Sequence, residues 1–128
     1  MVAVLCREEP MLRIAKVIDS GAVLFTSPLA MFEATLAIVH RKDCPPQKSA
    51  LDVSALVSQA NMAIVDIEPD MFEIAVSAFE RFGKGHHKAK LNLGDCFAYA
   101  VAKSRNASIL FVGDDFTHTD LPDALAAI

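Results

Sequence analysis

The stretch Ala22–Glu33 reads AVLFTSPLAMFE and contains the boundary between a strand and a helix. Its first five residues, Ala22 to Thr26, form a short apolar run of the kind found in buried strands. Ser27 and Pro28 follow, and a capping hydroxyl with proline at the first helical position starts a helix cleanly. The stretch therefore predicts a buried strand leading directly into a helix that carries Glu33.

The alternation of strand and helix continues along the chain. Met62 to Ile67 and Ser108 to Val112 are further short apolar runs that predict strands. The segments between them carry apolar residues at helical spacing, namely Leu29, Phe32, Leu36 and Val39, then Phe72, Ala75, Val76 and Phe79. Strands that alternate with helices favour a parallel sheet covered on both faces. The pattern predicts one α/β domain over residues 1–128, with three α/β/α layers.

Composition indicates a folded intracellular protein. Of the 128 residues, 53% are hydrophobic and 22% are charged, which is far from a disordered composition. Cys6, Cys44 and Cys96 are widely separated, which predicts free thiols in a reducing cytoplasm. No apolar run is long enough to span a bilayer, so no membrane is expected as a partner. The net charge of −4 argues against a general nucleic-acid coat protein but is compatible with a nuclease that has an acidic centre.

Four acidic residues lie at positions that make them candidate functional residues. Glu33 lies among apolar helical residues, where an unpaired ionised carboxylate is costly to bury. Asp114 and Asp115 follow a predicted strand, at the edge where parallel sheets place ligands, although turn formation explains them equally well. Asp95 stands in the first turn of a helix, where it also simply favours the helix dipole.

Such acids, if brought together, indicate a hard cation. Clustered carboxylates cannot all stay ionised without positive charge nearby. Oxygen-only ligation suits Mg²⁺ or Mn²⁺. The implied chemistry is metal-assisted hydrolysis of a phosphodiester, in which a metal orients and activates the attacking water.

A basic loop precedes Asp95. It suits a groove that guides RNA phosphates, and a solvated loop is the alternative interpretation. The adjacent histidines do not predict zinc, because neighbouring residues seldom point at one ion. The residues of this loop are Arg81, Lys84, His86, His87, Lys88 and Lys90.

Three stretches of the chain resemble a known family. Phe82–Ala100 reads FGKGHHKAKLNLGDCFAYA and Leu110–Asp120 reads LFVGDDFTHTD, and both resemble the VapC branch of PIN-domain ribonucleases. Ser27 to Ala37, which contains Glu33, resembles the segment where that family has its helix glutamate. The resemblance implies an α/β/α endoribonuclease toxin, usually a homodimer, held inactive by a VapB-like antitoxin. Its substrate would be cellular RNA and its cofactor Mg²⁺ or Mn²⁺.

The resemblance also assigns roles to residues. Glu33, Asp95 and Asp115 match the family's catalytic, metal-binding acids, and Asp114 is a further candidate ligand. Asn92 and Thr117 match polar positions that support the site, and each also has an ordinary capping or turn interpretation.

The resemblance departs at the amino terminus. Family members open with an apolar strand ending in aspartate, whereas this chain begins with the helix-like segment Met1 to Arg7. A start located upstream of Met1 and a truncated, catalytically inactive remnant are the two explanations, and we favour the first. Two other functions stay open: a noncatalytic module that binds an antitoxin or partner, and a receiver-like phosphoacceptor domain. The acid pair of a receiver follows its first strand, whereas Asp114 and Asp115 follow the last.

Overall fold

The computed structural model describes residues 23–85, 91–105 and 120. Its elements, in chain order, are β1 (Phe25–Thr26), α2 (Pro28–Lys42), α3 (Pro46–Gln59), β2 (Ala63–Ile64), α4 (Met71–Phe82) and α5 (Leu93–Ser104).

The two described strands run parallel. Phe25 pairs with Ala63 and Thr26 with Ile64. The backbone N–H of Ala63 donates to the carbonyl of Leu24 at 2.8 Å. The first two predicted strands are therefore confirmed in place, although each contributes only two residues to the ladder. The third, Ser108 to Val112, lies outside the described residues.

Local capping explains where α2 begins and ends. The Ser27 side chain accepts a hydrogen bond from the N–H of Ala30 at 3.2 Å, and Pro28 is the first helical residue. At the other end, Asp43 adopts the left-handed conformation with φ of 48°. The start predicted from Ser27 and Pro28 is confirmed.

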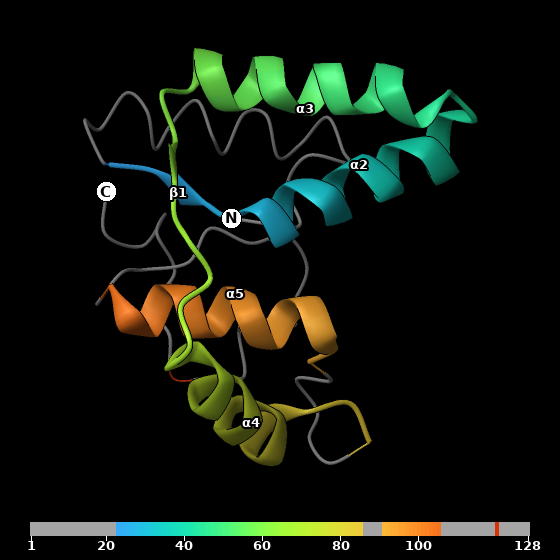
Figure 1. Cartoon of the computed structure of the whole chain (residues 1–128). Coiled ribbons are helices and arrows are strands. Elements are labelled where there is room, and N and C mark those ends of the chain that lie inside the picture. Colours follow the sequence, from blue (N-terminus) through green and yellow to red (C-terminus); the bar gives the residue numbers. More distant parts are fainter. Residues whose placement is uncertain (1–22, 86–90, 106–119, 121–128) are drawn as a thin grey trace.

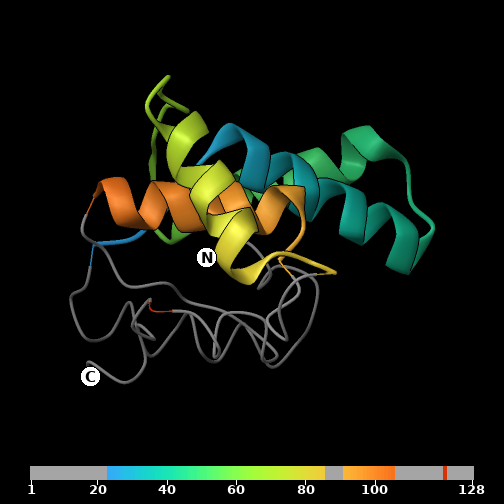
Figure 2. The ribbon, with the colours of Figure 1, turned by 90° about the horizontal axis from the view of Figure 1, so that it is seen from below.

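The helices form two pairs. Figure 1 shows α2 with α3 on one side of the molecule and α4 with α5 on the other. In the view from below in Figure 2, α4 lies towards the viewer and crosses in front of α5. Each pair has its own core: Ala34, Ile38, Val53 and Val57 in the first, and Met71, Phe82, Leu91, Tyr99 and their neighbours in the second. Helix α2 also contacts α5, and that contact joins the two pairs.

The buried faces of α2 and α4 differ from the predicted ones. In α4, Phe72, Val76 and Phe79 are 67%, 51% and 43% exposed, and in α2 Phe32 is 58% exposed. The residues that face the core are mainly smaller: Ala30, Ala34, Thr35 and Ile38 in α2, and Met71, Ala75, Ala78 and Phe82 in α4. Both helices carry apolar residues around much of their circumference, so spacing alone did not determine which face packs inward. Alanines allow the closer helix approach and occupy the interface.

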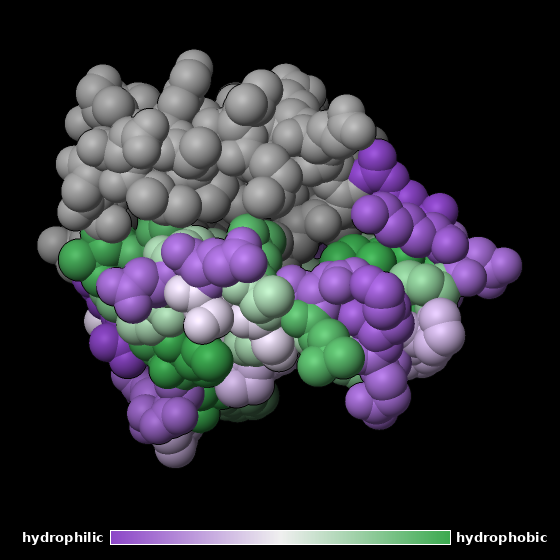
Figure 3. All heavy atoms as spheres, turned by 90° about the horizontal axis from the view of Figure 1, so that it is seen from above, coloured by the Kyte–Doolittle hydropathy of each residue, from purple (hydrophilic) through white to green (hydrophobic). Residues whose placement is uncertain are grey.

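The surface is mixed in polarity. Figure 3, which views the molecule from the α3 side, shows hydrophilic residues predominating near the junction of α2 and α3, with apolar areas elsewhere. None of the helices in the described ranges is long and apolar enough to cross a bilayer.

Candidate functional site

Glu33 of α2 lies directly against the first turn of α5. Its carboxylate occupies the space beside Gly94 that a side chain at position 94 would need. Within the described part of the chain, no group donates a hydrogen bond to the buried Oε1 of Glu33. Burial raises the pKa of Glu33 above its ordinary value, and the charge of Asp95 raises it further. Two of the predicted acids, far apart in the sequence, are thus close enough to interact.

Asp95 is held in place by a reciprocal pair of hydrogen bonds at the start of α5. Its N–H donates to Asn92 Oδ1 at 3.0 Å, and the N–H of Asn92 donates to Asp95 Oδ2 at 3.1 Å. This capping box satisfies two backbone donors that the helix itself leaves unpaired. The predicted capping role of Asn92 is confirmed, and Asp95 lies in the first turn of α5 as predicted, where it also completes the capping box. Capping also fixes the orientation of the Asp95 carboxylate relative to Glu33.

The pair of carboxylates fits a hard cation. A buried carboxylate with an unpartnered oxygen, next to a second carboxylate, is electrostatically unfavourable without a positive charge. Mg²⁺ needs only one or two protein carboxylates, since water and substrate oxygens complete its octahedral shell. Glu33 and Asp95 supply oxygen donors of this kind. Over residues 23–85, 91–105 and 120, no group of three or more His, Cys, Asp or Glu side chains gathers in one place.

The remaining predicted site residues fall partly outside the described residues. Asp114, Asp115 and Thr117 belong to the range 106–119, and His86, His87, Lys88 and Lys90 to the range 86–90. Their predicted roles stay predictions.

The base of the basic loop is well defined. Gly83 and Leu91 form an isolated parallel β-bridge. The N–H of Leu91 donates to the carbonyl of Phe82, and the N–H of Lys84 donates to the carbonyl of Leu91, both at 2.9 Å. The loop thus leaves α4 and returns at the start of α5, immediately before Asn92. Lys84 is exposed. Both ends of the loop are therefore anchored next to the capping box that holds Asp95.

Arg81 takes part in a polar network that the sequence did not reveal. Its Nη1 donates to the Tyr99 hydroxyl at 3.3 Å, and that hydroxyl donates to Asp120 Oδ1 at 2.7 Å. Lys103 Nζ lies 2.8 Å from Asp120 Oδ2. Burial and the hydrogen bond to Asp120 raise the pKa of Tyr99 to about 12. Although burial alone would raise the pKa of Asp120, hydrogen bonds from Lys103 and Tyr99 lower it below its ordinary value. Arg81 thus has a structural role in this network, and its contact with RNA stays a prediction.

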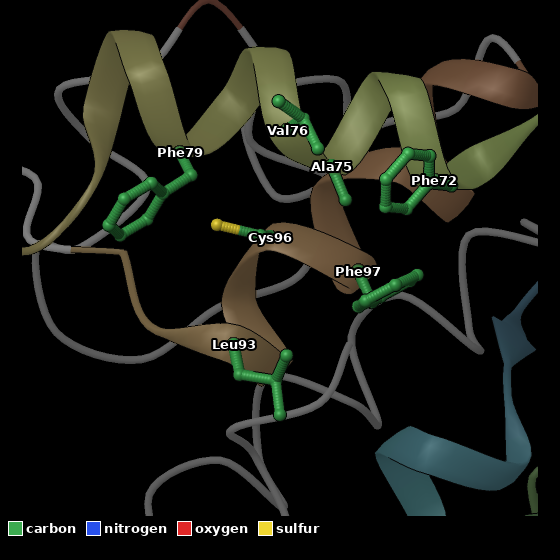
Figure 4. Close-up of a pocket in the computed structure, with 7 residues that line it drawn as sticks. All are labelled: Phe72, Ala75, Val76, Phe79, Leu93, Cys96 and Phe97. Atoms are coloured by element: carbon green, nitrogen blue, oxygen red, sulfur yellow. The ribbon is translucent and has the colours of Figure 1, made fainter.

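An apolar groove lies between α4 and α5. Figure 4 shows aromatic and aliphatic side chains from both helices around it, with the Cys96 thiol between them. The groove has a volume of about 410 Å³. Burial, followed by the charge of Asp95, raises the pKa of Cys96 above its ordinary value, so this thiol is a poor nucleophile. The lining residues are Phe72, Ala75, Val76, Phe79, Leu93, Cys96 and Phe97.

The fold and the paired acids agree with a family assignment made from the sequence. The family model described as "PIN domain" matches residues 1–121. The chain belongs to the PIN-domain family, which has an α/β fold, as the resemblance predicted.

Curated relatives place the chain near one branch of that family. It is 31% identical over 121 residues to VapC ribonuclease Mb0640 of Mycobacterium bovis, covering 94% of this chain and 90% of the relative. Ribonuclease VapC of Mycolicibacterium smegmatis is 35% identical over 96 residues, which is 75% of this chain and 73% of that protein. VapC ribonuclease R02377 of Rhizobium meliloti is 36% identical over 115 residues, with 80% of each chain covered. The predicted resemblance to VapC-type PIN domains is confirmed.

Proposed function

We propose that this protein is a metal-dependent endoribonuclease of the VapC toxin type, acting on cellular RNA in the cytoplasm. The observation that carries the proposal is the half-buried Glu33 carboxylate, which has one oxygen without a hydrogen-bond partner among the described residues and lies close enough to Asp95 for their charges to interact. Such an arrangement is unfavourable in a purely structural role and favourable around a cation. The names of the relatives, all VapC ribonucleases, agree with this assignment.

In this proposal the carboxylates of Glu33 and Asp95 hold the cation, and Asp115 and Asp114 are further proposed ligands. Bound Mg²⁺ or Mn²⁺ would neutralise negative charge on the phosphate oxygens and activate the attacking water. The capping box with Asn92 keeps the Asp95 carboxylate oriented before metal binds. Burial of Glu33 against Gly94 limits the positions that its carboxylate can adopt. Thr117 is proposed as a polar support of the same centre.

In this proposal the basic loop positions the RNA substrate. Lys84, His86, His87, Lys88 and Lys90, with the exposed part of Arg81, would contact phosphates next to the scissile bond. The bridge between Gly83 and Leu91 anchors this loop close to Asp95. Phosphate contacts supply salt-dependent affinity, so cleavage should weaken as ionic strength rises.

Cleavage of RNA with Mg²⁺ or Mn²⁺ tests the proposal directly. We expect Glu33→Gln and Asp95→Asn each to lower the cleavage rate at least about 100-fold. Replacing a residue that only hydrogen-bonds a metal ligand already lowers metal affinity or activity by about 10–100-fold. Both variants keep the size of the side chain, and the asparagine introduced by Asp95→Asn still offers an oxygen to the N–H of Asn92. Glu80→Gln, at an exposed position of α4, is the matched control and should cleave like the unchanged protein. Equal cleavage by Asp95→Asn and the unchanged protein would remove the site assignment.

The noncatalytic partner-binding module is the alternative function. If the unchanged protein binds its partners but does not cleave RNA with Mg²⁺ or Mn²⁺, this alternative would be favoured over the ribonuclease.

The partners in this proposal are a VapB-like antitoxin and a second copy of the chain. The exposed apolar residues Phe72 and Val76, which line the groove between α4 and α5, favour an association surface. We expect Phe72→Glu with Val76→Glu to convert a dimer into a monomer, measured by light scattering after size-exclusion chromatography. Leu51→Glu, at another exposed apolar position on α3, is the control and should leave the mass unchanged. A dimer that survives the double change would exclude this surface.

A further inference from the structure

The space that a side chain at Gly94 would occupy is filled by another residue. A Cβ built at position 94 would overlap the Oε2, Cδ and Oε1 atoms of Glu33, closer than real Cβ atoms approach other groups. All three nearest atoms belong to this one carboxylate. The absence of a side chain at position 94 is therefore what allows Glu33 to lie against α5.

Ordinary reasons for a glycine do not apply at this position. Gly94 is the second residue of α5, and it is not among the glycines with positive φ. Alanine is the better helix former at such a position. Gly83 provides a contrast, because a Cβ there would meet the backbone carbonyl of Phe79, which cannot move without disturbing α4. At Gly94 the obstacle is only the end of a flexible side chain.

We propose that Gly94 is a positioning residue that reserves the place of the Glu33 carboxylate next to Asp95. The inference rests on the proposed function, in which these two acids share a cation. A methyl group at position 94 would push the Glu33 carboxylate away while α5 and its capping box stay intact. The expected consequence is a folded protein with a disrupted metal site, which separates positioning from a role in folding.

Titration of the metal-free protein with Mn²⁺, together with urea unfolding, tests this role. We expect Gly94→Ala to weaken Mn²⁺ binding at least tenfold while its urea midpoint stays at or above that of the unchanged protein. Ser104→Ala is the control, because Ser104 is an exposed residue at the other end of the same helix, away from Glu33 and from the apolar groove. It should bind Mn²⁺ within twofold of the unchanged protein.

A compensating change makes the test more specific. When Glu33→Asp is combined with Gly94→Ala, the acid becomes shorter by one methylene and leaves room for the new methyl group. This double variant should recover part of the lost Mn²⁺ affinity, whereas a general defect of α5 would not be repaired by it. Binding by Gly94→Ala within twofold of the unchanged protein would overturn the proposal.

A metal-free measurement separates this inference from the proposed function. If the unchanged protein bound no Mn²⁺, or if Glu33→Gln bound it equally well, the proposed function would fail. Contact between positions 33 and 94 is then still measurable from the urea midpoints of Glu33→Ala, Gly94→Ala and the double variant. Because the side chains compete for one space, the two single shifts should not add up to the shift of the double variant. Additive shifts would contradict the positioning role by themselves.

Discussion

The ionised carboxylate of Glu33 is poorly stabilised by the residues around it. Its carboxylate packs against Gly94, its Oε1 is buried without a hydrogen-bond partner among the described residues, and Asp95 is the nearby charge that acts on it. Natural proteins keep such unfavourable groups mainly at functional sites, where the unfavourable interaction is relieved by a ligand. At the scale of single residues, the account is that Glu33 destabilises the metal-free protein and binds the cation.

This view predicts a pH-dependent effect of Glu33→Gln on stability. Because the folded state raises the pKa of Glu33, it holds the proton more tightly than the unfolded state does. The stability linked to this proton is fully present below the ordinary pKa of glutamate and is lost as pH rises through the folded-state pKa. Metal-free Glu33→Gln should therefore have a higher urea midpoint than the unchanged protein at pH 7, and the gain should shrink towards pH 4. A gain that is equal at both pH values would contradict the raised pKa.

At the scale of elements, capping residues connect helix stability to the site. Ser27 caps α2 and Asn92 caps α5, but only Asn92 also holds a candidate metal ligand. Both caps were predicted from the sequence, because capping depends on a few adjacent residues and not on the rest of the fold. The buried faces of α2 and α4 were not predicted, since alanines and large apolar residues alternate around both helices and only tertiary packing selects between them.

The two caps make a matched pair of variants. Ser27→Ala and Asn92→Ala should each lower the free energy of unfolding by about 0.5–2 kcal/mol, the usual value of a helix cap. Only Asn92→Ala should also weaken Mn²⁺ binding, because it releases the Asp95 carboxylate from the capping box. Urea unfolding and Mn²⁺ titration of both variants check this. Equal loss of Mn²⁺ affinity in Ser27→Ala would indicate that the effect comes from general loosening of the helices.

At the scale of the whole molecule, Tyr99 connects α5 to α4 and to Asp120 near the end of the chain. It accepts from Arg81, donates to Asp120, and packs its ring 5.8 Å from that of Phe82. The sequence contains no local signal for this network, because Tyr99 and Asp120 are 21 residues apart and have no shared spacing pattern. The approach of Glu33 to Asp95 was predicted only because the family resemblance supplied a long-range relation.

Removal of the Tyr99 hydroxyl should lower stability without disturbing the core. We expect Tyr99→Phe to reduce the free energy of unfolding by about 0.5–1.5 kcal/mol, the usual net value of a hydrogen bond, because the ring is kept.

Asp120→Asn should also be destabilising at pH 7, and its effect should fade as the pH falls through the lowered folded-state pKa of Asp120. The two variants should be coupled in a double-mutant cycle measured by urea unfolding. Full additivity would indicate that the hydrogen bond contributes nothing.

The most direct measurement is the Mn²⁺ affinity of four proteins: the unchanged chain, Glu33→Gln, Asp95→Asn, and the variant with both changes. If the two acids share one ion, each single change weakens binding strongly and the second change adds much less than the first, because the site is already broken. If Mn²⁺ binds equally well to all four, the two carboxylates do not form a metal centre and the account of this site is wrong.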